Sequence, residues 1–379
     1  MIPNNSNFMD YLGSLETDPI PATEKEISAA GAAVLEKSGL RQKGKRTKHW
    51  GRILLIAAAV TLGAAVTVAA SGYDIGEMFR GYFEHGGPSI NSGGASSTLT
   101  QSQVKVLDQS GSALNISAVN NGTTIAVKAV TGDPNDAYIL FEITAPKGTK
   151  LDRNDYTFER DDDNSQTELT EKGGGKIRSD HSWGGGWDYK TLKDPNPVGN
   201  KINLVMSIHY SGIDLRGKEV HLDLKDITVP DPKRKTEYLP VLKGEWKLTV
   251  PLDFTSSTKE LTVNKPTNFK PYINPKAPAE EKAKESKVSY RCIVKSVSLS
   301  PLSATVAFSH DKAETKEYAN PTPFVLTLHF KDGTKADMQG IGPGSAKGTE
   351  STQNYLFDTP VEINNIFSIT IGDLTVPVS

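Results

Sequence analysis

Cysteine is almost absent from this sequence of 379 residues, which contains one, Cys292. A single thiol excludes an intramolecular disulfide and any metal site that needs several thiolates. An excess of one charge is lacking as well, because 43 Lys and Arg face 45 Asp and Glu and leave a formal net charge of -2. Without concentrated basic surface, the chain is not expected to bind nucleic acid.

Catalytic motifs are missing too. None of the 7 histidines belongs to an H-E-x-x-H pair, and neither G-x-S-x-G nor G-x-x-x-x-G-K-[ST] occurs. His209 and His329 lie within strand-like segments and are interpreted as packing or surface residues. We therefore expect no enzyme activity, no catalytic residues, no cofactor and no metal.

One long apolar run is present, at residues 53–71, where nineteen residues carry no charge. A helix of that length spans roughly 28 Å, close to the ~30 Å hydrocarbon core of a bilayer. The run follows some 50 polar residues, whereas a secretory signal places a shorter apolar segment near the N-terminus. We interpret residues 52–71 as a transmembrane helix; cleavage after Ala70 and a buried helix of a soluble protein remain as alternatives.

The flanks of this run set its orientation. Residues 37–52 contain seven Lys or Arg and no acid, and such basic flanks stay on the cytoplasmic side. The sequence thus predicts a single-pass protein of the cell membrane with a cytoplasmic N-terminus and an extracytoplasmic C-terminus. The lipid bilayer is its first expected partner, and the basic cluster is expected to meet anionic headgroups.

The predicted cytoplasmic tail, residues 1–48, is too short for a domain of its own. Thr23 and Glu26 form a capping box before a stretch of good helix formers that ends near Gly39, which predicts one short helix. Ahead of it lies an apolar stripe at helical spacing, made of Phe8, Tyr11, Leu12 and Leu15. Such a stripe stays loose, lies on the membrane or binds a protein partner.

Residues 72–110 are predicted to hold two juxtamembrane helices and a Gly/Ser linker at 86–97. In the first helix the apolar residues at 75, 78, 79, 82 and 83 share one face, which should dock on a folded module or enter the headgroup layer. The second, within residues 98–111, reads as a short capped helix.

Beyond residue 111 the apolar pattern changes to a period of two. Residues 111–273 read as successive strands, with Asn121 and Gly122 forming a tight hairpin turn. Residues 274–287 are charged and rich in Pro and Ala, which indicates a linker, and residues 288–379 return to strands. The predicted fold is therefore mainly β, with one N-terminal transmembrane helix followed by two extracytoplasmic β-sandwich modules.

An internal repeat supports two modules. The segment VKAVTGDPNDAYILF at residues 127–141 matches VKSVSLSPLSATVAF at residues 294–308, and KDITVP ending at Pro230 echoes GDLTVP ending at Pro377. Chance remains the alternative, because alternating Val and Ile are common in strands.

An insert in the first module holds the one chemically suggestive loop. Trp183 and Trp187, separated by three glycines, are candidates for stacking on the apolar face of a sugar. The alternative is an edge hairpin whose aromatic rings pack locally.

These residues resemble a known family. A charged tail, one apolar helix, GYDIGEMFRGYF, LTQSQ and NGTTIAVKAVTGDPNDAYILFEITAPKGT together resemble a domain-of-unknown-function family of Firmicutes membrane proteins described as anti-sigma-factor-like. The resemblance covers roughly residues 45–160, and the C-terminal module is similar to Ig-like domains that sometimes follow it. It implies an inner segment that holds an extracytoplasmic-function sigma factor and an outer sensor. Residues 1–52 lack the Cys-x-x-Cys of zinc-type anti-sigma folds, so sigma binding would proceed without zinc.

The leading hypothesis is a regulatory membrane protein that couples an outer sensing region, with an envelope ligand, to a cytoplasmic partner. The alternative is a cell-surface binding or structural module, for wall polysaccharide or a protein, without a signalling role.

Overall fold

The computed structural model describes residues 74–88, 98–159, 167–177, 184–192, 199–234, 237–270, 289–310, 323, 325–341, 346–347 and 349–378. All of them belong to one compact unit, Ala59–Ser379. The predicted cytoplasmic tail, the transmembrane helix at 52–71 and the linker at 274–287 lie outside these residues, as does cleavage after Ala70. Among the described residues, no helix is long and apolar enough to cross a membrane.

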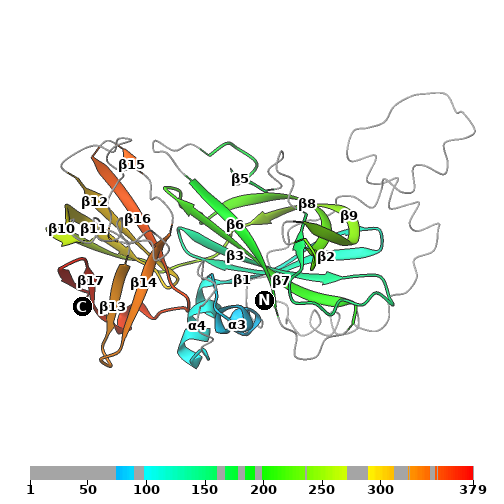
Figure 1. Ribbon diagram of the computed structural model, residues 1–379, viewed down its shortest axis with the longest axis horizontal. Helices are drawn as coiled ribbons and strands as arrows, with labels where there is room; N and C mark the ends of the chain where they lie inside the picture. Colours follow the sequence, from blue (N-terminus) through cyan, green and yellow to red (C-terminus); the bar gives the residue numbers. More distant parts are fainter. Residues whose placement is uncertain are drawn as a thin grey trace, which may run out of the picture. The chain divides into compact units, whose positions relative to one another are not determined.

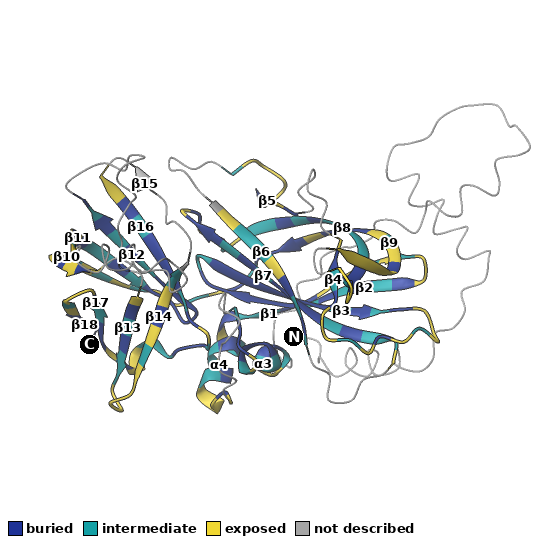
Figure 2. Cartoon of the chain, viewed as in Figure 1, coloured by how far each residue is buried: buried dark blue, intermediate teal, exposed yellow. Residues whose placement is uncertain are grey.

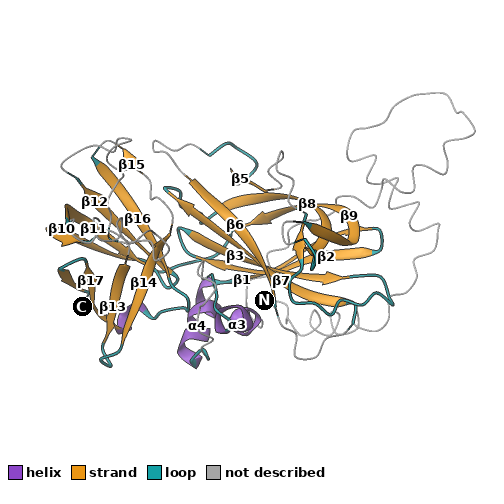
Figure 3. Ribbon diagram, in the orientation of Figure 1, coloured by secondary structure: helices purple, strands orange, loops and turns teal. Residues whose placement is uncertain are grey.

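Two short helices form where the sequence predicts them, α3 at Ile75–Glu84 and α4 at Gln101–Ser110. Asp74 caps α3 by accepting the backbone N–H of Glu77, and Thr100 and Gln103 close a full capping box on α4. The apolar face of α3 is buried, which confirms that it docks on the folded part of the chain. Figure 3 shows the two helices side by side against the strands.

The first β module comprises strands β1 to β9 (Figure 1). Its bounds are β1 Ser112–Asn120, β2 Thr123–Gly132, β3 Asp136–Thr144, β4 Thr157–Phe158, β5 Thr167–Glu171, β6 Gly184–Thr191, β7 Lys201–Ser211, β8 Lys218–Pro230 and β9 Tyr238–Pro251. A five-stranded sheet has the order β1-β2-β3-β7-β6, and a second sheet has β4, β8 and β5 with β9 paired to β8. All pairs are antiparallel, and the positive φ angles of Asn121 and Gly122 confirm the predicted hairpin turn.

The strand β3 explains the continuous apolar run YILF. Ile139 and Phe141 point into the core shared by the two sheets of the first module, while Tyr138 and Leu140 point to the other face, onto α3 and α4. A strand covered on both faces needs no polar alternation, and Figure 2 shows β3 as buried along most of its length.

The second β module comprises strands β10 to β18 and has its own core. Its bounds are β10 Lys259–Phe269, β11 Tyr290–Leu299, β12 Ser303–Ser309, β13 Val325–Phe330, β14 Lys335–Ile341, β15 Ala346–Lys347, β16 Glu350–Leu356, β17 Ile366–Ile371 and β18 Leu374–Pro377, with a 3-10 turn at Ile363–Asn365. The order is β10-β11-β12-β16-β14-β13-β17-β18, with β15 paired to β16. The chain is therefore mainly β, as predicted.

The repeat seen in the sequence is also a repeat of register. In the first copy Val127 pairs with Phe141 and Ala129 with Leu140, so that one residue is bulged out at position 128. The second copy has the same irregularity, because Val294 pairs with Phe308 and Ser296 with Ala307. A shared bulge at equivalent positions is a backbone feature that alternating Val and Ile do not produce by themselves.

Two parts of the module assignment differ from the sequence reading. Residues 259–269 were assigned to the first module, yet β10 pairs along its length with β11 and places Phe269 in the second core. The sequence matched KDITVP, ending at Pro230, with GDLTVP, ending at Pro377. In the structure, LTVP at 374–377 is the last strand of the second module. Its counterpart in the first module is LTVP at 248–251, which ends the last strand, β9. The first difference depends on pairing between residues distant in the chain, and the second on the order of the strands within each module; local patterns encode neither.

Candidate functional site

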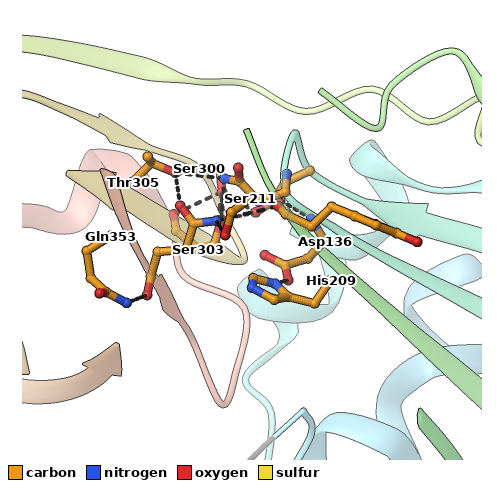
Figure 4. A network of polar contacts seen from close by, with 11 residues as sticks. Asp136, His209, Ser211, Ser300, Ser303, Thr305 and Gln353 are labelled. Atoms are coloured by element: carbon orange, nitrogen blue, oxygen red, sulfur yellow. Dashed lines mark hydrogen bonds and ion pairs between the residues drawn. The ribbon is translucent and has the colours of Figure 1, made fainter. Parts of the chain in front are cut away.

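The two repeated turns meet each other at the point where the modules touch (Figure 4). In each turn the first residue donates its N–H to the carbonyl of the fourth, Asp133 to Asp136 and Ser300 to Ser303. In each, the side chain of the first residue also accepts the N–H of the fourth. The copies differ in chemistry, because the first residue is a carboxylate in one module and a hydroxyl in the other.

Asp133 joins the two turns. Its Oδ1 accepts the N–H groups of Asn135 and Asp136, both at 2.9 Å, and its Oδ2 accepts the hydroxyls of Ser300 and, at 2.7 Å, Ser303. Complete burial, together with the charge of Asp136, raises the pKa of Asp133 to about 7 against the effect of these hydrogen bonds. The carboxyl is therefore poised to change charge near neutral pH.

Further hydrogen bonds surround this contact. Asn135 Nδ2 donates to Thr305 Oγ1 at 2.9 Å, and Thr305 in turn donates to Asn354 Oδ1 at 2.9 Å. Asn354 Nδ2 donates to Ser211 Oγ at 3.3 Å, which returns to the first module. We call Asp133, Asn135, Ser211, Ser300, Ser303, Thr305 and Asn354 the polar junction.

A groove opens beside the polar junction, on the face of the five-stranded sheet that carries α3. Its volume is about 540 Å³, within the range of small-molecule sites. Side chains from α3 and from the neighbouring strands β3, β6 and β7 line it, namely Tyr82, Asp136, Tyr138, Lys190, Ser207 and His209. Antiparallel pairing brings them together, because Asp136 faces His209, Tyr138 faces Ser207, and Gly186 faces His209 from the other side.

Asp136 and Tyr138 lie side by side on β3 in the wall of the groove, and each is 1 % exposed. His209 Nδ1 donates to Asp136 Oδ1 at 2.6 Å, while Asp136 Oδ2 and the hydroxyl of Tyr138 have no hydrogen-bond partner. Burial disfavours the charged imidazole, yet the charge and hydrogen bond of Asp136 prevail and raise the pKa of His209. Unpaired buried polar atoms are rare in folded proteins, and two on alternate residues of one strand mark this end of the groove.

Lys190 ties the groove to α3. Its ammonium donates to the carbonyl of His85 at 2.7 Å and to that of Gly87 at 3.4 Å, and it lies over the ring of Tyr82 at 5.4 Å from the centroid. Burial lowers the pKa of Lys190. His85 is the C-cap of α3, so the strand β6 and the end of the helix are held together at the groove.

Among the described residues, no cluster of three or more His, Cys, Asp or Glu side chains is placed to hold an ion. The groove instead offers hydroxyls, a carboxylate and an ammonium, a set suited to hydrogen bonding with a polar molecule.

The sequence singled out few of these residues. Trp187 borders the groove, but it pairs with Ile208 and packs against the core of the first module. Trp183 lies outside the described residues, and so do Phe8, Tyr11, Leu12 and Leu15 of the predicted partner-binding stripe. His209, interpreted as a packing or surface residue, lies in the groove. Its pairing with Asp136 depends on strand register, which the sequence did not reveal.

Comparisons with known proteins give little beyond this geometry. No protein-family model matches the chain, and no curated protein matches it. A crystal structure of a "conserved domain protein" from Bacillus anthracis is similar, with 13% sequence identity and a TM-score of 0.41, over 68% of this chain and 75% of that one.

Proposed function

We propose that this chain is a single-pass membrane protein of the regulatory, anti-sigma-factor-like kind, in which an outer sensing region controls a cytoplasmic partner. In this proposal the two β modules are Ig-like sandwiches outside the cell, and the groove is the sensing site. Residues 1–48 hold an extracytoplasmic-function sigma factor inside.

One observation carries the proposal: the groove is walled by α3. This helix begins at Ile75, a few residues after the predicted transmembrane segment at 52–71, and its Tyr82 lines the groove. Lys190 binds the carbonyls that follow the helix. A molecule in the groove therefore contacts the part of the outer region that lies nearest in sequence to the predicted membrane helix.

The attachment of α3 suits a signalling role because its contacts are specific. Gly76 lies against α4, where its N–H donates to Asp108 Oδ1 at 2.7 Å, and Phe79 and Phe83 are buried against the sheet. Ligand binding that alters these contacts changes the position of α3, and a two-state element biased by a ligand is what coupling between sites requires.

Partner capture tests the inner half of the proposal. The full chain in phospholipid nanodiscs is incubated with a cytoplasmic extract of the source cells, beside a chain that lacks residues 1–48. We expect a sigma factor to be retained by the full chain and lost with the truncation. Substituting Phe8 and Leu12 by Ala should weaken retention, whereas Tyr238→Phe, at an exposed tyrosine of β9 outside both the tail and the groove, should leave it unchanged.

The opposite result is equally definite. If no sigma factor is retained, or if the truncated chain retains as much, the regulatory proposal is wrong. The chain would then be a cell-surface binding or structural module whose tail serves as an anchor.

A further inference from the structure

We infer that the groove binds an uncharged, hydroxyl-rich ring, that is, one or two units of a neutral glycan. This inference rests on the proposed function, because it names the class of molecule that the outer region senses. It comes from the chemistry of the groove rather than from the tryptophans singled out in the sequence, whose described member faces the core.

The polar atoms that lack partners define the first requirement. Asp136 Oδ2 is an acceptor, and the Tyr138 hydroxyl is both donor and acceptor; the two residues lie two positions apart on the same face of β3. Both atoms are buried, so a ligand reaches them only if the side chains that cover them move. A ligand that then satisfies both must offer a donor and an acceptor within a short distance. Neighbouring hydroxyls on a sugar ring do so, and a site built to bond hydroxyls discriminates strongly in their favour.

The charges of the groove define the second requirement. An anion would face Asp136 and Asp188. The positive groups are engaged elsewhere, Lys190 by two backbone carbonyls and the Tyr82 ring, and His209 by Asp136. Phosphate or carboxylate ligands are therefore disfavoured.

A cationic ligand is disfavoured for a related reason. Lys190 occupies the face of Tyr82 on which an ammonium group would otherwise bind, and its own charge repels a second cation. His209 already neutralises Asp136 when protonated. A neutral molecule that forms hydrogen bonds through its hydroxyls avoids the unfavourable charge interactions of both an anion and a cation.

Gly186 leaves the space for the ring. It lies on β6 opposite His209 and lines the groove, and a side chain added at this position would meet no atom within 4 Å. The Gly186→Leu substitution therefore fills the groove with little effect on the fold. Gly81, on α3, also has open space at its Cβ position but does not line the groove, which makes Gly81→Leu the matched control.

Calorimetric titration of the full chain in nanodiscs, free of glycoside detergent, tests the inference. The probes are cellotriose and N,N′,N″-triacetylchitotriose as neutral trisaccharides, chitotriose, the deacetylated triamine, as the cationic match, and trigalacturonate as the anionic one. We expect a neutral probe to bind with a Kd below about 1 mM and both charged probes to bind at least about tenfold more weakly.

Variants locate the binding. Gly186→Leu should weaken binding of the neutral probe about tenfold or more, and Gly81→Leu should not change it. Tyr138→Phe should weaken it about fivefold, the usual effect of one lost hydrogen bond, without loss of stability because the hydroxyl has no partner in the protein. Tyr238→Phe, at an exposed tyrosine of β9, should have no effect.

Three results overturn the inference: no binding of either neutral probe, preferential binding of a charged one, or equal binding by Gly186→Leu. Failure of the inference and failure of the proposed function remain distinguishable. A neutral glycan that binds while the tail retains no sigma factor supports the site and removes the regulatory role. A retained sigma factor with no glycan binding leaves the regulatory role and removes this ligand class.

Discussion

The two repeated turns share a backbone and differ in chemistry. Residues 133–136 and 300–303 have the same internal hydrogen bonds and follow the same bulge, yet Asp133 and Asp136 of the first copy correspond to Ser300 and Ser303 of the second. The Asp133 carboxylate accepts the hydroxyls of Ser300 and Ser303, so the difference between the copies makes the two turns complementary.

The same difference distinguishes the groove from the equivalent position in the second module. Asp136 pairs across the strands with His209, whereas the equivalent Ser303 faces Leu356, so the second module has no ion pair at this position. The helices α3 and α4 likewise cover the sheet of the first module. The repeated strands and turns provide the fold, and the residues that differ between the two copies provide the polar junction and the groove.

The largest expected effect on stability tests whether the repeated strands of the two modules are equivalent. Phe141 and Phe308 occupy the same repeat position, and both are fully buried in their own cores. We expect Phe141→Ala and Phe308→Ala each to lower the free energy of unfolding by about 3–5 kcal/mol, measured by urea denaturation. A cost below about 1 kcal/mol for either would contradict the equivalence.

The next effect is a pH dependence of stability that arises from the first turn, residues 133–136. Because the pKa of Asp133 is about 7 in the folded chain and about 3.9 when unfolded, the protonated carboxyl contributes stability in full below about pH 4. That contribution, up to about 4 kcal/mol, is lost as the pH rises to about 7. The raised pKa of His209, which faces Asp136, adds stability that is present below about pH 6.5 and lost at higher pH.

An isosteric substitution of Asp133 separates its contribution to the pH dependence from that of His209. The difference in unfolding free energy between Asp133→Asn and the unsubstituted chain should change steadily between pH 4.5 and pH 7.5, in favour of the variant at high pH. Ser300→Ala, at the equivalent position of the second turn, removes a hydroxyl that lowers the pKa of Asp133 and should extend the loss of stability to higher pH. A parallel pH profile for Asp133→Asn would show that Asp133 keeps an ordinary pKa.

A smaller effect is expected where α3 crosses α4, a feature of the first module. A Cβ atom on Gly76 would lie 2.3 Å from the carbonyl oxygen of Val104, so Gly76→Ala forces the helices apart. We expect a loss of about 1–3 kcal/mol in thermal or urea unfolding. Gly81→Ala, in the same helix with open space around it, should be neutral or stabilising by up to about 1 kcal/mol. Equal effects at the two glycines would argue against this close contact.

The smallest expected effect concerns the rim of the polar junction. Asn135 corresponds to Leu302 in the repeat and donates to Thr305. Asn135→Ala removes this bond and should lower the free energy of unfolding by about 1 kcal/mol. A cost near zero, with Asp133→Asn retaining its effect, would place the stability of the junction in Asp133 and the two serines alone.

The sequence predicted what depends on neighbouring residues. Alternation identified the strands, Asn121 and Gly122 identified the hairpin, and residues 98–111 predicted a short capped helix, because each of these features is local. The sequence placed β10 in the wrong module and gave no sign of the groove, because strand pairing and the meeting of Asp136 with His209 join residues far apart in the chain. Strand parity alone shows that Trp187 faces the core once β6 is paired with β7.

Amide hydrogen exchange of the full chain tests the central claim, that the groove and α3 respond together to a ligand. Exchange is followed in nanodiscs with and without a saturating neutral trisaccharide, beside the Gly186→Leu variant. The account predicts slower exchange in residues 75–84 and 184–191 when the ligand is present, no change in residues 366–371, and no slowing in the variant. Slowing confined to the strands, or slowing of α3 that persists in Gly186→Leu, would contradict it.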